Sequence, residues 1–164
     1  MRRLWKTVTD LELQADELRA GSCGVIEIVA SRLVDIHLWP WPKQASLLEV
    51  WWGENWHHHR AKGDRCLLYY KQPRRLPNFL ALTYILSSSG ATFRTSRGAL
   101  AVLDEIAHIK RSDAIVCQVK SSRITERLLR RFGWDRHITG SRSRHYIKRF
   151  YGEYAEPALA LDFC

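Results

Sequence analysis

Cysteine is scarce in this sequence, and its cysteines are not arranged in pairs. Four occur in 164 residues and none forms a CxxC motif; they are Cys23, Cys66, Cys117 and Cys164. This wide spacing argues against a zinc ribbon and against a disulfide-stapled fold. We therefore expect reduced thiols in a cytoplasmic protein.

Long apolar runs are also missing. A transmembrane helix needs about 20 apolar residues, and the longest candidates are interrupted by charges at Arg32, Asp35, Lys43 and Glu49. The N-terminus is basic, but the stretch from Thr7 to Glu17 carries acids where a signal peptide has its apolar region. We expect neither export nor a membrane span.

Acidic residues are nearly absent from one segment. Residues 110–152 contain 12 Lys or Arg and 3 Asp or Glu, whereas the rest of the chain has 14 of each, so the net charge of +9 arises in this segment. Such a surface attracts a polyanion, which can be nucleic acid, a membrane surface or a phosphorylated cofactor such as coenzyme A. Charge alone leaves these three open.

What the sequence does have is enough apolar surface for a core. Hydrophobic residues make up 46% of the chain, and seven are tryptophans. At this length we expect one domain, over residues 1–164.

The first half of the sequence predicts a small helix and several strands. Turn residues and apolar patterns place a helix over Asp10–Ala20, ended by Gly21, and a second over Gln44–His59. The strands are predicted over Gly24–Ala30, Leu33–Trp39 and Arg65–Lys71. Residues 30–32 fit either a turn or one bent strand.

The second half alternates strands and helices. The strand Phe79–Leu86 is apolar on both faces, which predicts a central position with cover on both sides. It is followed by a helix over Ala99–Ile109, a strand over Asp113–Val119, a helix from Ser121 or Ser122 to Phe132, and a strand over Arg144–Tyr151. The first helix has the buried stripe Leu100, Leu103, Ile106 and Ala107. This order implies a parallel crossover and an α/β (α+β) fold with a mixed β-sheet flanked by helices.

Two short motifs resemble the GNAT acyltransferase superfamily. The first motif is a strand followed by a helix, and it comprises the strand Asp113–Val119, the helix after it and the helix ending Phe132-Gly133-Trp134. In that superfamily the preceding helix begins with Gln or Arg, two residues, Gly, one residue, and Gly or Ala, whose amides hold the pyrophosphate of acyl-CoA. The matching stretch here is Arg94-Thr95-Ser96-Arg97-Gly98-Ala99, in which Arg97 replaces the first glycine.

The resemblance covers residues 79–152, which form an acyl-CoA-binding-like half. Residues 1–78 are a divergent N-terminal half and residues 153–164 a C-terminal tail. The run Arg144–Gly152 also resembles a bacterial group with this layout. The resemblance implies a GNAT-like mixed sheet, acetyl-CoA or another acyl-CoA as cofactor, and direct acyl transfer to an amine that the sequence does not name.

The residues that the resemblance assigns to the cofactor lie at two helix starts: Arg94, Thr95, Ser96, Arg97, Gly98 and Ala99 at the first, and Ser122 and Arg123 at the second. A large side chain at Arg97 can obstruct a backbone site, although its guanidinium can itself contact phosphate. Leu129 stands where the superfamily often has a Tyr that protonates the leaving thiolate. Leucine has no transferable proton, so we name no catalytic residue and leave enzymatic activity open.

Two other functions remain as alternatives. One is a non-catalytic module that binds nucleic acid through the basic segment, and the other is a degenerate GNAT fold used for protein interaction, as Arg97 and Leu129 together suggest. We expect no metal, because the adjacent residues His57-His58-His59 point in different directions on a helix. The tryptophans of the first half fit core packing or a homodimer interface better than a substrate wall.

Overall fold

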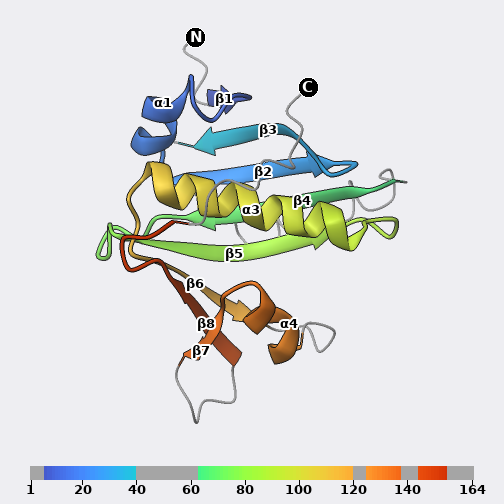
Figure 1. Ribbon diagram of the computed structural model, residues 1–164. Helices are drawn as coiled ribbons and strands as arrows, with labels where there is room; N and C mark the ends of the chain where they lie inside the picture. Colours follow the sequence, from blue (N-terminus) through green and yellow to red (C-terminus); the bar gives the residue numbers. More distant parts are fainter. Residues whose placement is uncertain (1–5, 40–62, 120–124, 138–143, 155–164) are drawn as a thin grey trace.

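The computed structural model describes residues 6–39, 63–119, 125–137 and 144–154 (Figure 1). Its strands form one mixed sheet of eight strands in the order β1-β3-β2-β4-β5-β6-β8-β7. The strands are β1 (Lys6–Val8), β2 (Cys23–Val29), β3 (Arg32–Trp39), β4 (Arg65–Lys71), β5 (Phe79–Ser87), β6 (Ala114–Val119), β7 (Asp135–His137) and β8 (Arg144–Arg149). The helices are α1 (Ala15–Ala20), α3 (Phe93–Ile109) and α4 (Glu126–Arg131). The predicted α/β (α+β) class is confirmed.

The main core lies between α3 and one face of the sheet. Figure 1 shows α3 lying against the sheet and running roughly along the strands, and it packs on β2, β3 and β4. Strand residues alternate between the two faces, so every second residue reaches the helix. The core side chains under α3 include Ile26, Ile28, Ile36 and Leu68, all fully buried.

Strands β2 and β3 form a hairpin with a tight turn. Ala30 and Ser31 both have positive φ angles, 49° and 66°. Two such residues give the turn whose twist matches that of the flanking strands. Residues 30–32 therefore contain a turn and not a single bent strand.

Helix starts differ most from the prediction. The predicted helix from Asp10 is helical only from Ala15, because the Asp10 carboxylate accepts bonds from the amides of Glu12 and Leu13 and holds a turn there. Helix α3 begins at Phe93 and not at Ala99, because the Thr92 hydroxyl caps it.

Helix α4, unlike α3, starts later than predicted. Thr125 caps α4 by accepting a hydrogen bond from the amide of Leu128 at 3.2 Å, so α4 begins at Glu126 and not directly after Ser121 or Ser122, which lie outside the described residues. Its end is as predicted, since Gly133 has a φ of 79° and stops the helix.

Among the strands, β4 matches its predicted bounds and β7 was not predicted. Strand β5 lies inside the sheet as predicted; Leu80 is fully buried, and the other residues apart from Thr83 and Ser87 are half-buried. Strand β8 ends at Arg149, and Tyr151 lies in a turn with a φ of 52°.

The predicted helix Gln44–His59 lies outside the described residues. Within the residues that are described, no helix is long and apolar enough to cross a bilayer.

Candidate functional site

Strands β5 and β6 begin side by side and then separate. Their parallel ladder runs from Phe79↔Ala114 to Leu82↔Cys117 and ends there. Strand β5 continues to Ser87, while β6 stays paired with β8 as far as Val119. In Figure 1, β6 and β8 diverge from β5. We call this separation beyond Leu82 and Cys117 the fork.

The fork leaves part of the β5 backbone without a ladder partner. Beyond Leu82, the edge of β5 that faced β6 has no strand beside it in the described part of the chain. Backbone N–H and C=O groups are strong hydrogen-bonding groups, so such an edge can bind an extended ligand.

A β-bulge lies at the same point of β5. Tyr69 pairs with Tyr84 and Tyr70 pairs with Leu82, so Thr83 is the extra residue. Its hydroxyl donates to the carbonyl oxygen of Tyr69 at 3.0 Å. A bulge disrupts the ladder locally and leaves its extra residue without a backbone partner. The bulge at Thr83 directly follows the last β5–β6 pair.

Free amides surround the connection from β5 to α3. Over the described residues, the N–H groups of Ser89, Gly90, Phe93 and Arg94 have no hydrogen-bond acceptor. Phe93 and Arg94 are the first two residues of α3, a helix of 17 residues whose dipole is positive at this end. We call these four N–H groups the amide site. Unpaired N–H groups at the start of a helix suit an anion with several oxygens.

An anion of the protein's own lies beside the amide site. The Asp64 carboxylate accepts a hydrogen bond from the Thr92 amide at 2.7 Å and one from the Thr92 hydroxyl at 3.1 Å. The bond from the Thr92 backbone is the main cause that lowers the pKa of Asp64. Asp64 is therefore ionised at neutral pH and offsets part of the positive potential at the start of α3.

The start of α3 is also tied to the β2–β3 hairpin. The Thr95 side chain is completely buried, and its hydroxyl oxygen accepts a hydrogen bond from the Ser31 amide at 3.0 Å. Thr95 was predicted to contact the cofactor, and in the structure its buried hydroxyl holds the start of α3 to the hairpin.

The other residues of the predicted phosphate loop lie in the first two turns of α3. Gly98 and Ala99 are buried against the core and Ser96 is half-buried, while Arg94 and Arg97 are exposed three residues apart. Residues i and i+3 share one face of a helix. The two guanidinium groups therefore project from the same side of α3.

Ser122 and Arg123 lie outside the described residues. The amide site was missed in the sequence because the helix start was placed six residues too late, at Ala99 instead of Phe93. The turn Ser88-Ser89-Gly90 followed by Thr92, a good N-cap residue, was the signal for it.

The start of α3 and the residue that follows α4 meet next to this site through two aromatic rings. The ring centroids of Phe93 and Phe132 are 5.6 Å apart, and Phe93 is 58% exposed. Leu129, four residues before Gly133, is buried in the core. No acid therefore stands at that position of α4.

Cys117 lies at the last pair before the fork. Burial raises the pKa of its thiol to about 12, so the thiol is protonated at neutral pH.

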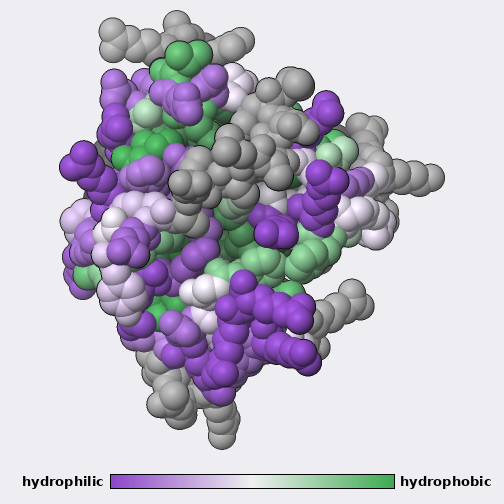
Figure 2. Space-filling model, in the orientation of Figure 1, coloured by the Kyte–Doolittle hydropathy of each residue, from purple (hydrophilic) through white to green (hydrophobic). Residues whose placement is uncertain are grey.

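A basic surface lies along α4. Arg127, Arg130 and Arg131, together with Glu126, line an open groove. Arg130 pairs with Glu126 at 2.8 Å, whereas Arg127 and Arg131 have no ion-pair partner among the residues of known placement. Figure 2 shows an extended hydrophilic surface over this lower part of the molecule.

Comparison with solved structures shows a distant structural similarity, whereas comparison with protein families shows none. No protein-family model and no curated protein matches the chain. Among solved structures, the chain is similar to the crystal structure of nourseothricin acetyltransferase, with a TM-score of 0.42 and 10% sequence identity. The similarity covers 90% of this chain and 99% of that one.

Proposed function

We propose that this protein binds acetyl-CoA or another acyl-CoA at the fork and transfers the acyl group directly to an amine. The observation that carries the proposal is that three features lie together: the separation of β5 and β6, the bulge at Thr83, and the amide site after the C-terminal end of β5. The β5–α3–β6 unit has the parallel layout that the GNAT resemblance implies.

Each feature has a part in this proposal. The diphosphate accepts hydrogen bonds from the amide site, and the exposed guanidinium groups of Arg94 and Arg97 add positive charge on the same side of α3. The amide groups of the pantetheine arm pair with the open edge of β5, as an added strand would. Backbone N–H groups on the open edge of β5, near the Thr83 bulge, stabilise the negative charge that develops on the thioester oxygen.

The transfer itself needs a neutral amine close to the thioester carbon. The amine nitrogen attacks this carbon, the carbon–sulfur bond breaks, and the proton that the amine loses passes to water. Since Leu129 cannot donate a proton, coenzyme A leaves as a thiolate and is protonated by solvent.

Isothermal titration calorimetry with acetyl-CoA and with acetyl-pantetheine tests the binding step. Acetyl-pantetheine lacks the diphosphate, so it should bind distinctly more weakly. Release of free thiol in the presence of a panel of amines then tests transfer. Binding without thiol release would support a degenerate GNAT fold, and absence of acetyl-CoA binding at millimolar ligand would remove the proposal.

Removal of the Asp64 charge should strengthen acyl-CoA binding. In Asp64→Asn the side-chain oxygen can still accept the hydrogen bond from the Thr92 amide, but the negative charge beside the amide site is gone. We expect the Kd for acetyl-CoA to fall about three- to tenfold at low salt, and the gain to shrink as salt screens the repulsion.

Calorimetry at two salt concentrations measures this effect. Asp16→Asn is the matched control, because Asp16 is exposed on α1 and pairs with Arg19. Weaker binding by Asp64→Asn would mean that the carboxylate shapes the site and does not repel the ligand.

The basic groove of α4 supports a second candidate function, the holding of nucleic acid, because two of its arginines have no described partner. For duplex DNA the logarithm of the affinity should fall with the logarithm of the salt concentration by about 0.9 per phosphate contacted. The double variant Arg127→Gln, Arg131→Gln should reduce that slope by about two, and replacement of the exposed Arg32 on β3 by Gln should leave it unchanged. Absence of binding at low salt excludes this candidate.

A further inference from the structure

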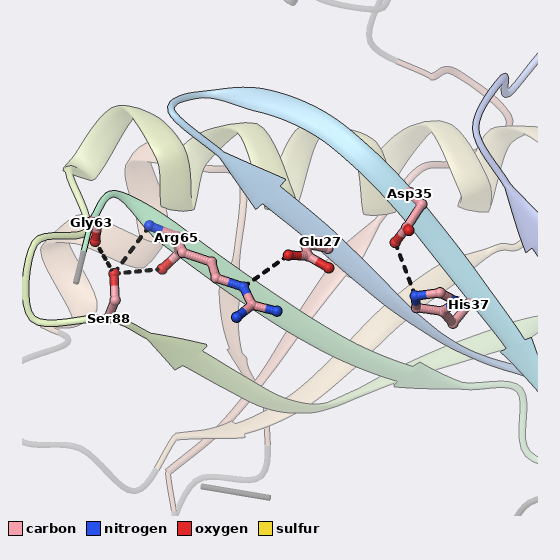
Figure 3. A network of polar contacts seen from close by, with 6 residues as sticks. All are labelled: Glu27, Asp35, His37, Gly63, Arg65 and Ser88. Carbon is pink, nitrogen blue, oxygen red and sulfur yellow. Dashed lines mark hydrogen bonds and ion pairs between the residues drawn. The ribbon is translucent and has the colours of Figure 1, made fainter. Parts of the chain in front are cut away.

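A polar cluster lies on the sheet face opposite α3, away from the fork. Figure 3 shows Glu27 on β2, Asp35 and His37 on β3, and Arg65 on β4 directed to this face. The paired residues Ile26 and Ile36 point into the core, so their neighbours Glu27 and Asp35 point to the other side. Glu27 and Asp35 are themselves paired across the two strands.

His37 is held from both sides of its ring. Its Nδ1 lies 3.3 Å from the hydroxyl of Thr7 on β1, and its Nε2 lies 3.2 Å from Asp35 Oδ1. When Nδ1–H donates to Thr7, the lone pair of Nε2 faces the carboxylate. Metal-binding histidines have this arrangement, with the second ring nitrogen fixed by a hydrogen bond.

Asp35 Oδ1 lacks a hydrogen bond. The atom is buried and receives no hydrogen bond from any described residue, although His37 Nε2 is near. Buried carboxylate oxygens are normally hydrogen-bonded or bound to a cation. Two electron-pair donors, Asp35 Oδ1 and His37 Nε2, therefore face one another, and a cation bound between them would stabilise both.

We propose that Asp35, His37 and Glu27 bind a divalent transition-metal ion of the zinc class. Their ligand atoms all lie within 4.8 Å of one another. Two ligands of a tetrahedral zinc ion with bonds of about 2.0–2.1 Å stand about 3.4 Å apart, and Asp35 Oδ1 and His37 Nε2 are separated by 3.2 Å. Glu27 supplies the third ligand after a side-chain rotation, and water completes the site.

The charges of the cluster favour a cation. The side chains of Glu27 and Asp35 are only 18% and 20% exposed, so their charges are partly shielded from water. Among the described residues, Arg65 is the one cationic side chain paired with them other than the imidazole, with its Nε 2.8 Å from Glu27 Oε1. Two carboxylates and one guanidinium leave a net charge of about −1, and the second oxygen of Glu27 remains for a metal.

The choice of metal follows from the ligands. One imidazole with two carboxylates suits zinc, whereas magnesium and calcium prefer oxygen ligands alone. The sequence did not reveal this site, because Glu27 joins Asp35 and His37 only through the hairpin pairing.

Zinc and cobalt titrations of the full chain test the site. We expect one strongly bound zinc ion by calorimetry, and visible absorption bands typical of tetrahedral Co²⁺ on cobalt loading. His37→Ala and Asp35→Asn should each raise the zinc Kd by at least about tenfold and abolish the cobalt bands. Thr7→Val, which removes only the hydrogen bond to Nδ1, should raise it by about tenfold.

Two control variants separate this cluster from other histidines. His108→Ala on α3, beside Glu105 at 3.5 Å, and the triple variant His57→Ala, His58→Ala, His59→Ala should keep the cobalt bands. Absence of zinc binding, or equal affinity in the wild type, His37→Ala and Asp35→Asn, would overturn the proposal. The test needs no acyl-CoA and is independent of the proposed transferase activity.

Discussion

Replacement of Trp134 by alanine should lower the free energy of unfolding by about 3–5 kcal/mol. Trp134 is only 2% exposed and belongs to the buried cluster that includes Leu129 and Tyr146. It directly follows Gly133, and its amide donates to the carbonyl oxygen of Leu129 at 3.0 Å. Loss of the indole therefore leaves a cavity and loosens the contact that holds α4.

Urea denaturation followed by circular dichroism measures this loss. Tyr151→Ala is the control for removal of an aromatic ring from the surface, because Tyr151 is 84% exposed, and its effect should stay within about 0.5 kcal/mol. Trp134→Phe should recover part of the stability by refilling the pocket. A loss below about 1 kcal/mol in Trp134→Ala would mean that the neighbouring side chains collapse into the space.

The longer strands could be predicted because they are short apolar runs rich in aliphatic and aromatic residues. In β4 the sequence shows a short apolar run, Cys66 to Tyr70, between the charged residues Arg65 and Lys71, and these charges marked its bounds, whereas the alternation of its burial is visible only in the structure. Strand β7 was missed because it has three residues, all exposed, and exists only through its pairing with β8.

Helix starts could not be predicted as well because several residues compete as caps. Residues 87–96 include four serines and two threonines, and both residue types are good N-cap residues. Thr92 is the cap that also binds Asp64 through its amide. Asp64 is 28 positions away in the sequence, so a local sequence pattern does not reveal this partner. Thr125 was likewise passed over for Ser121 and Ser122.

This shift in helix start removes one difficulty of the sequence comparison. Arg97 replaces an expected glycine, and a large side chain beside a backbone anion site would obstruct it. In the structure Arg97 lies in the second turn of α3 and is exposed, beyond the free amides of Phe93 and Arg94. Its side chain is thus compatible with an anion at the helix start. The fork and the Thr83 bulge depend on strand pairing and had no sequence signal.

The amide site itself can be tested by removing one N–H group. Phe93 is the first residue of α3, where proline is well tolerated because this N–H has no partner within the helix. Thr92 before it has φ −82° and ψ 157°, a conformation that suits a residue preceding proline. Phe93→Pro should therefore keep α3 and delete a single donor.

Phe93→Ala is the matched comparison, because it also loses the ring that contacts Phe132 but keeps the N–H group. A hydrogen bond to a charged group contributes about 1.5–3 kcal/mol, so Phe93→Pro should bind acetyl-CoA about 10- to 100-fold more weakly than Phe93→Ala. Acetyl-pantetheine, which has no diphosphate, should bind both variants equally. Equal acetyl-CoA affinities in calorimetry, with unchanged helix content in both variants, would show that the Phe93 amide donates nothing to the ligand and would remove the start of α3 from the proposed site.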